Sequence, residues 1–151
     1  MFRGLSKVTL DAKGRMAIPS RYRERILSRS DGLLVITADV RDACLMLYLL
    51  PDWEEFERKL SRSPTLHPAA RRLQRLMQGY AADAEMDNHG RVLVPSVLRE
   101  VVGLEKQCML VGQGTRFEIW DEERWVEASA RWRAENDDFS DLPPELESLF
   151  F

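Results

Sequence analysis

The chain has 151 residues, of which 44% are hydrophobic and 31% charged, and its formal net charge is −3. This composition is typical of a soluble globular protein and excludes a chain that is disordered throughout. The longest aliphatic run, residues 44–50, is far shorter than the roughly 20 residues that span a bilayer. Because the N-terminus also lacks an apolar signal segment, we expect a cytoplasmic protein without membrane contact.

Alternating hydrophobicity and turn residues predict a first unit of mixed strands and helix. Val8 and Leu10 alternate with polar neighbours, as in a strand with one buried face. Asp and Gly then favour a turn, and Ser20 can cap a short helix. The predicted elements are a strand over 5–10, a turn over 11–14, a strand over 15–18, a helix over 20–27, and strands over 32–37 and 44–50.

A helical linker is predicted next. Trp53, Phe56 and Leu60 recur at helical spacing, and Asp52 can cap that helix. A second helix is predicted over residues 67–79, where apolar residues align on one face and arginines lie away from it. These helices separate the first unit from the rest of the chain.

The same order of elements returns after residue 80. We predict a strand that ends at Met86, a turn over 87–90, a strand through Val92 and Val94, a helix over 96–102 that Gly103 ends, and strands over 108–111 and 116–120. A third helix after residue 121 carries Trp125, Ala128 and Trp132 on one stripe. Beyond residue 136 we expect an acidic, mobile tail whose apolar end, residues 149–151, can dock on a partner.

A motif that occurs twice, 76 residues apart, relates the two units. It reads Asp-Ala-Lys-Gly-Arg over residues 11–15 and Asp-Asn-His-Gly-Arg over residues 87–91, and Pro-Ser follows each copy after three more residues. Of the fourteen positions aligned from residue 11 and from residue 87, seven are identical, whereas unrelated windows would share roughly one. The chain therefore contains an internal duplication.

Each repeat is too small to fold alone. Four short strands and one short helix cannot bury a sufficient core, so the two repeats must close on each other. Strands exchanged between the repeats would pair their exposed edges. The predicted fold class is α+β, mainly β.

The chain resembles the MraZ family of bacterial transcriptional regulators. The resemblance rests on the opening Met-Phe-Arg-Gly, on the two Asp-x-x-Gly-Arg turns with their following prolines, and on the helices between them. It implies a duplicated AbrB-like swapped-hairpin β-barrel with short helices and a helical linker. On this basis we expect a first AbrB-like repeat over 5–52, the linker over 53–80, a second repeat over 81–124, and a C-terminal helix with acidic tail over 125–151.

The same resemblance implies a function and partners. Members of the family form rings of several subunits and bind direct repeats of double-stranded DNA upstream of the division and cell-wall gene cluster, mainly as repressors of their own operon. We therefore expect a nucleoid-associated, ring-forming homo-oligomer that represses transcription.

Charge and motif together select the candidate DNA-binding residues. Residues 1–30 carry eight basic and two acidic side chains, whereas the chain from residue 117 carries eleven acidic and three basic ones. Arginine can grip a phosphate or a guanine edge with two parallel hydrogen bonds. The DNA-binding candidates are Arg15, Lys13, Arg91, His89, Arg3 and Lys7, and the candidates for shaping the turns are Asp11, Gly14, Asp87, Gly90, Pro19 and Pro95.

Two alternatives stay open at this point. Each Asp and Arg of the motif can simply pair across its turn and hold the repeats together.

His89 carries less positive charge than Lys13 at neutral pH, so we expect the first turn to be the principal DNA reader. At the level of function, the rival is an oligomeric protein-interaction scaffold or an antitoxin-like protein that binds a partner without reading DNA.

The sequence argues against catalysis and against a bound cofactor or metal. The Gly-rich segment 112–115 lacks the lysine of a phosphate-binding loop, and neither histidine has further ligands at metal spacing. Ser20 and Ser96 are interpreted as helix caps, and Cys44 and Cys108 as reduced core thiols. We expect no catalytic residue, no metal site and no small-molecule substrate.

Overall fold

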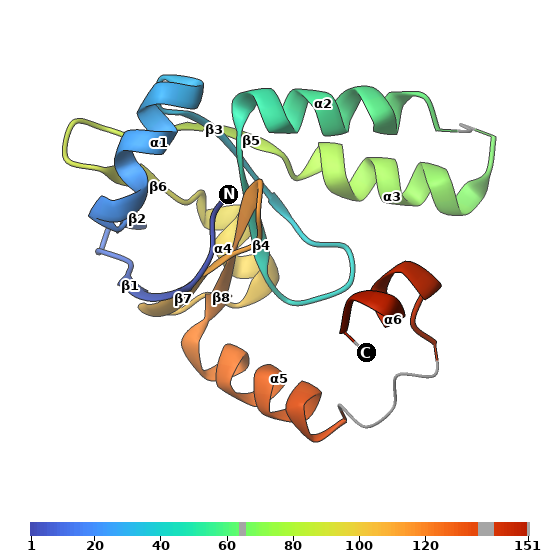
Figure 1. The fold of residues 1–151 in the computed structure, drawn as a ribbon. Coiled ribbons are helices and arrows are strands. Elements are labelled where there is room, and N and C mark those ends of the chain that lie inside the picture. Colours follow the sequence, from blue (N-terminus) through green and yellow to red (C-terminus); the bar gives the residue numbers. More distant parts are fainter. Residues whose placement is uncertain (64–65, 136–140, 151) are drawn as a thin grey trace.

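A computed structural model describes residues 1–63, 66–135 and 141–150 (Figure 1). Both repeats have the predicted order of strand, turn, strand, helix, strand and strand, which is therefore confirmed. The elements are β1 (Leu5–Thr9), β2 (Arg15–Ala17), α1 (Ser20–Ser30), β3 (Leu33–Ala38), β4 (Leu45–Leu49), α2 (Leu50–Ser61), α3 (Pro68–Gly79), β5 (Ala82–Glu85), β6 (Arg91–Leu93), α4 (Ser96–Val102), β7 (Gln107–Gly112), β8 (Arg116–Asp121), α5 (Glu122–Ala134) and α6 (Pro144–Phe150).

The two repeats exchange strands within one antiparallel sheet. The strand order is β1-β7-β8-β4-β3-β5, so β1 of the first repeat pairs with β7 of the second, and β5 of the second pairs with β3 of the first. The central pair, β4 and β8, joins the last strands of the two repeats. The predicted exchange is confirmed, and it means that neither repeat has a complete sheet of its own.

Strands β2 and β6 form a separate two-stranded ribbon across the sheet. Met16 and Val92 face each other in this ribbon and are fully buried, so their neighbours along each strand point outward. The described strands form an open sheet and this ribbon, with one bridge from Leu10 to Met16 between them, so the expected barrel is not closed by a continuous ladder. Pro19 and Pro95 follow closely, and their missing N–H groups help to keep the ribbon short.

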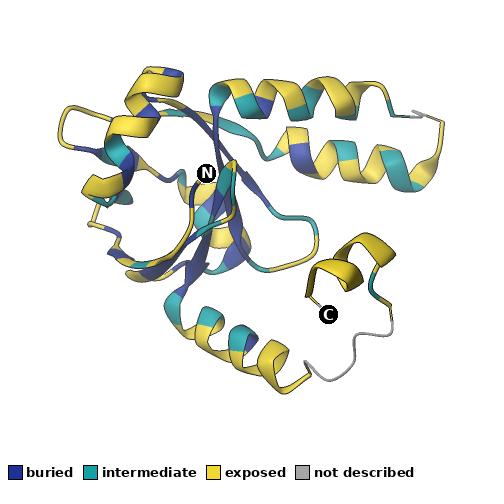
Figure 2. Ribbon diagram, viewed as in Figure 1, coloured by how far each residue is buried: buried dark blue, intermediate teal, exposed yellow. Residues whose placement is uncertain are grey.

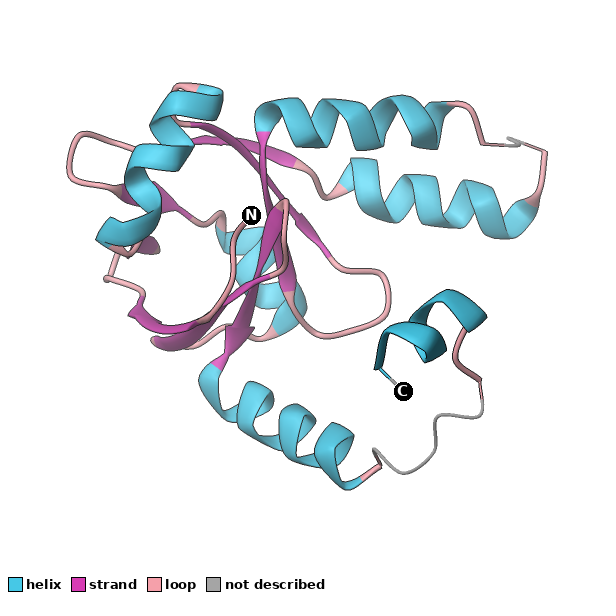
Figure 3. Cartoon of the chain, viewed as in Figure 1, coloured by secondary structure: helices cyan, strands magenta, loops and turns pink. Residues whose placement is uncertain are grey.

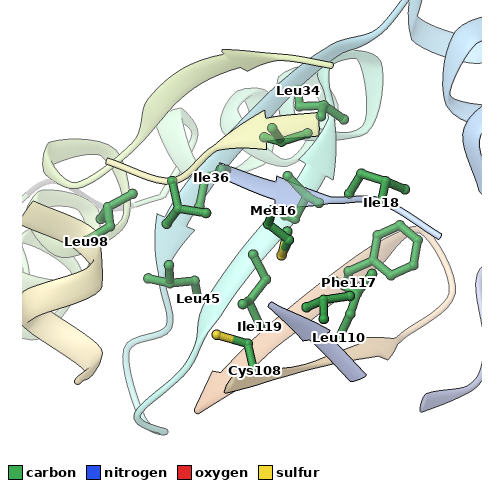
Figure 4. Packing of buried hydrophobic residues seen from close by; sticks show 14 of the residues in the cluster. Met16, Ile18, Leu34, Ile36, Leu45, Leu98, Cys108, Leu110, Phe117 and Ile119 are labelled. Carbon is green, nitrogen blue, oxygen red and sulfur yellow. The ribbon is translucent and has the colours of Figure 1, made fainter. Parts of the chain in front are cut away.

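The main hydrophobic core fills the space between the ribbon and the six-stranded sheet (Figure 4). Met16 and Ile18 point into it from the ribbon side, Leu98 from α4, and Phe117 and Ile119 from β8. Aliphatic side chains of β3, β4 and β7 complete it. The core is thus built from both repeats, as the size of each repeat requires.

Helices α2, α3 and α5 cover the other face of the sheet (Figures 1 to 3). Trp53 of α2 and Met77 of α3 pack on Val35, Met46 and Tyr48, which alternate with the main-core residues of β3 and β4. A third cluster joins α5 to β7 and β8, where the rings of Trp120 and Trp125 lie 5.6 Å apart. Because both faces of β3, β4 and β7 are covered, the sequences of these three strands are nearly continuous hydrophobic runs. No helix within the described ranges is both long and apolar enough to cross a membrane.

The capping roles predicted for Ser20, Ser96 and Asp52 were wrong, although α1 and α4 begin at the predicted residues. Helices α1 and α4 begin at Ser20 and Ser96, with Pro19 and Pro95 in the capping position, and neither serine makes a capping hydrogen bond. A proline in the extended conformation before the helix therefore takes the place predicted for the serine. Helix α2 begins at Leu50, so Asp52 lies in its first turn, where a carboxylate suits the helix dipole.

The prediction for the thiols is confirmed, and the prediction for the tail is not tested. Cys44 and Cys108 are both buried free thiols, as predicted, and burial raises the pKa of the Cys108 thiol to about 12. The mobility expected for the tail beyond residue 136 stays a prediction, and within this tail residues 144–150 form the exposed helix α6. Leu149 and Phe150 are exposed, whereas residues 136–140 and 151 lie outside the described residues.

Phe117 provides a test of the shared core. Its ring is fully buried and lies 4.3 Å from Phe2 and 4.9 Å from Tyr22, measured between ring centroids. We expect Phe117→Ala to lower the free energy of unfolding by about 3–5 kcal/mol, because it removes packing against both repeats and leaves a cavity. Urea unfolding followed by circular dichroism measures this. Val126→Ala, at a side chain that is 58% exposed, is the control, and we expect a change within about 0.5 kcal/mol.

Candidate nucleic-acid interface

The first motif forms a turn that its aspartate organises. The Asp11 carbonyl accepts the Gly14 N–H at 3.0 Å, and Asp11 Oδ1 accepts the N–H groups of Lys13 and Arg15 at 2.9 and 2.8 Å. Asp11 Oδ2 accepts Arg15 Nε at 3.0 Å, so one carboxylate shapes the turn and orients the arginine.

The second motif repeats this geometry. Asp87 Oδ1 accepts the N–H groups of His89 and Arg91 at 2.8 and 2.9 Å, and the Asp87 carbonyl accepts the Gly90 N–H at 3.0 Å. The ion pair is looser here, with 3.4 Å between Arg91 Nε and Asp87 Oδ2. The carboxylates engage Nε in both turns, so neither of these pairs uses the terminal nitrogens of Arg15 or Arg91.

Backbone hydrogen bonds lock each turn to the other repeat. The Gly14 carbonyl accepts the Val94 N–H at 2.9 Å, and the Gly90 carbonyl accepts the Ile18 N–H at 2.8 Å. Gly14 and Gly90 have φ angles of 84° and 74°, which favour glycine. Each donor directly precedes a proline, Pro19 or Pro95. The twin turns therefore join the two repeats.

Two arginines that the sequence analysis did not select cover these glycines. Arg99 Nε donates to the Val94 carbonyl at 3.0 Å, and Arg23 Nε donates to the Ile18 carbonyl at 2.7 Å. A Cβ atom added to Gly14 would lie 2.7 Å from Arg99 Cζ, and one added to Gly90 would collide with Arg23. Arg23 and Arg99 are among the seven identical positions of the repeat alignment, so the signal was present in the sequence.

The outward face of the ribbon presents both motif arginines. Arg15 lies opposite Leu93 and Arg91 opposite Ala17, so the four residues share the face away from the core. The side chains of Arg15 and Arg91 are 32% and 36% exposed. Both arginines line one groove of about 770 Å³ beside the ribbon.

The other DNA-binding candidates lie apart from this pair. Because β2 and β6 are antiparallel, the exposed residues Lys13 and His89 lie at opposite ends of the ribbon. Lys7 is on β1, where its Nζ lies 3.4 Å from Glu122 Oε1. Arg3 lies further along, with its backbone packed against Gly112 and its carbonyl accepting the Tyr22 hydroxyl. The structure therefore brings Arg15 and Arg91 together. It does not bring Arg3, Lys13 and His89 to the same place.

Hydrogen bonding keeps both motif carboxylates charged. The pKa of Asp11 is lowered from its usual value chiefly by the backbone N–H of Arg15, and that of Asp87 chiefly by the backbone N–H of Arg91. Each aspartate partly offsets the charge of its arginine and fixes its direction. The arrangement can present two oriented guanidinium groups to an anion that approaches the ribbon.

Comparisons with known proteins identify relatives along the whole chain. The family model described as "MraZ protein, putative antitoxin-like" matches residues 1–76 and again residues 77–141. Proteins named transcriptional regulator MraZ are 53% identical in Coxiella burnetii (strain RSA 493 / Nine Mile phase I) and in Halorhodospira halophila, over 99% of both chains in each case. The protein of that name from Methylococcus capsulatus is 46% identical over 100% of both chains.

Gly14 should be intolerant of a side chain. We expect Gly14→Ala to lower the free energy of unfolding by about 2 kcal/mol or more, because alanine is strained at positive φ and its Cβ would displace Arg99. Gly79→Ala is the matched control, since a Cβ at Gly79 meets nothing within 4 Å and its φ is ordinary. Urea unfolding of both variants measures the difference, and equal effects would contradict the interlocked turn.

The lowered pKa values of Asp11 and Asp87 predict how acid affects stability. A carboxyl whose pKa is lower in the folded chain than in the unfolded chain stabilises the fold at pH values above its unfolded pKa, here 3.8. This stabilisation is lost as the pH falls through the folded pKa. We therefore expect the double variant Asp11→Asn/Asp87→Asn to be less stable than the wild type at neutral pH. The gap should narrow below about pH 4. Urea unfolding at a series of pH values measures it, and a gap independent of pH would show that the two charges do not matter.

Proposed function

The chain belongs to the MraZ family, and we propose that it is a DNA-binding transcriptional regulator that represses its own division and cell-wall gene cluster from direct repeats upstream. The observation that carries this proposal is the β2–β6 ribbon, which buries Met16 and Val92 on one face and presents Arg15 and Arg91 on the other. The relatives named as transcriptional regulators support the same class of function.

The dimensions of the ribbon support contact with the major groove. Two paired strands lie about 4.8 Å apart, and the major groove, about 12 Å wide, admits a two-stranded ribbon. Arginine is the residue that most often reads guanine there, through two hydrogen bonds to O6 and N7. Arg15 and Arg91 are held in place before binding by Asp11 and Asp87, so less side-chain entropy is lost when DNA binds.

A ring-forming homo-oligomer would explain how a chain with a net charge of −3 holds DNA. A few phosphate contacts per subunit give weak and strongly salt-dependent binding. Linked subunits on tandem direct repeats raise the overall affinity through effective concentration, without new contacts. In this arrangement the ribbons converge on the duplex and the protein is nucleoid-associated in the cytoplasm.

One observation favours the second candidate, a protein-interaction scaffold or antitoxin-like protein. The side chains of Leu146, Leu149 and Phe150 on the acidic helix α6 are 41%, 74% and 69% exposed. Exposed apolar groups of this kind are suited to a protein partner. The matched family is also described as antitoxin-like. A partner-binding tail and a DNA-binding ribbon can coexist, so DNA binding itself decides between the two candidates.

Promoter binding tests the proposed function. A labelled duplex from upstream of the chain's own gene is titrated with wild type, Arg15→Ala, Arg91→Ala and Arg58→Ala, and binding is followed by gel shift at two salt concentrations. We expect salt-sensitive binding that prefers direct repeats, and a loss of about tenfold or more for each ribbon variant, because one bidentate base contact is worth about 1–3 kcal/mol. Arg58 is exposed on α2, away from the ribbon, so the Arg58→Ala variant should bind DNA like the wild type.

Light scattering must show that each variant keeps the oligomeric state of the wild type. Absence of any retardation by the wild type at low salt would reject the regulator and favour the scaffold. If Arg15→Ala and Arg91→Ala bind DNA as tightly as the wild type, the ribbon is not part of the DNA interface.

A further inference from the structure

A long groove runs along the seam between β1 and the ribbon. Two hollows, of about 770 and 580 Å³, adjoin there and share Thr9 and Ala17. The bridge between Leu10 and Met16 holds β1 and β2 together at one point, and the groove occupies the space beside it. We call this combined hollow the seam groove.

Basic side chains line both ends of the seam groove. Those at one end are Arg15, Arg91, Arg99 and Lys106, and those at the other are Lys7, Arg21 and Arg23. The carboxylates that line it, Asp11 and Glu105, are both at the first end, and Asp11 is already engaged by Arg15. The seam groove therefore has an excess of positive charge in a chain whose net charge is negative.

Several of these cations are available for a ligand. Across the described ranges, Arg23, Arg99 and Lys106 form no ion pair with a carboxylate. Arg23 and Arg99 use Nε to hold a carbonyl, so these bonds leave the terminal nitrogens unused. The ion pair of Arg91 with Asp87 uses the buried Nε, which makes no hydrogen bond among the described residues, and does not use the terminal nitrogens. A planar guanidinium fixed through Nε suits a phosphate, which accepts two parallel hydrogen bonds.

The duplicated seam, between β5 and β6, carries less positive charge. At the positions 76 residues later, Asp83 replaces Lys7 and Glu85 replaces Thr9, and both acidic residues are exposed. Val97 similarly replaces Arg21. The counterpart of Glu105 is Arg29, which is paired with Asp52 at 3.2 Å, just as Lys7 of the first seam is paired with Glu122 at 3.4 Å. A polyanion that approaches the ribbon is therefore attracted more strongly from the β1 side than from the β5 side.

We propose that the seam groove binds the DNA phosphate backbone, with Arg23, Arg99 and Lys106 as phosphate ligands, and that the β5–β6 seam faces away from the duplex. This inference rests on the proposed function and extends it from the ribbon to its surroundings. A ribbon with two equivalent flanks would suit a palindromic site, since protein two-fold symmetry is mirrored in the site. One basic flank gives each chain a single orientation on DNA, which suits direct repeats.

Charge changes on the two seams test the proposal. Binding of a promoter duplex is followed by fluorescence anisotropy from about 50 to 200 mM salt, with wild type, Lys106→Ala, Arg23→Gln and Arg99→Gln. Glutamine removes the charge but can still donate to the carbonyl that each arginine holds. We expect each variant to bind about three- to tenfold more weakly, and the slope of log affinity against log salt to shrink by about one for each phosphate that the variant leaves without a cation.

A matched pair of reversals uses the duplication as its own control. Lys7→Asp makes the first seam resemble the second, and we expect a loss of about tenfold or more with a shallower salt slope. Asp83→Lys makes the second seam resemble the first, and we expect affinity within about twofold of the wild type. Lys59→Asp, with the same charge change at an exposed site on α2, should also remain within this limit. Thermal unfolding of each variant excludes loss of the fold.

The outcomes separate the two proposals. A wild type that shows no salt-dependent DNA binding rejects the proposed function. Normal wild-type binding with unchanged salt slopes in the Arg23, Arg99 and Lys106 variants rejects the seam groove alone. Equal losses for Lys7→Asp and Lys59→Asp would show that only net charge matters, and a large gain for Asp83→Lys would show that both seams face the duplex.

Discussion

The reciprocal hydrogen bonds between the two glycine turns are the constraint on which the rest of the structure depends. The Gly14 and Gly90 carbonyls accept N–H groups that belong to the opposite repeat, and this places β2 beside β6. Once the ribbon is formed, Met16 and Val92 face inward and close the main core against the sheet. The exchanged pairs β1–β7 and β3–β5 then complete a sheet that neither repeat could build alone.

The same constraint prepares the surface for binding. Gly14 and Gly90 allow the chain to reverse, and Asp11 and Asp87 orient Arg15 and Arg91 outward. Arg99 covers Gly14, and Arg23 covers Gly90. The DNA recognition that we propose therefore uses the same residues that stabilise the fold. An Asp–Arg pair that closes the turn through Nε can also present the terminal nitrogens, so the structural and the DNA-binding interpretations of the motif are compatible.

Much of this architecture was predictable from the sequence, because the duplication fixes the order of elements and their small size demands exchange. The first residues of α1 and α4 were predicted correctly, but their capping residues were not, since Pro19 and Pro95 take the positions that the propensity of serine suggested for Ser20 and Ser96. The extent of barrel closure could not be predicted from the sequence, because it depends on where hydrogen bonding between β1 and β2 stops. Arg23 and Arg99 were visible as identities between the repeats, but only the fold shows that they cross to the opposite turn.

The fusion of both repeats into one chain has a consequence for how this surface can change. In a homodimer of single repeats, every substitution would appear on both sides of the two-fold axis, so a lysine gained on one flank would be gained on the other. Here Lys7 and Asp83 occupy equivalent positions with opposite charge, while the interlocked turns keep their symmetry. Covalent linkage thus lets selection act on one half of a symmetric scaffold at a time, and turns a two-fold unit into one with a direction.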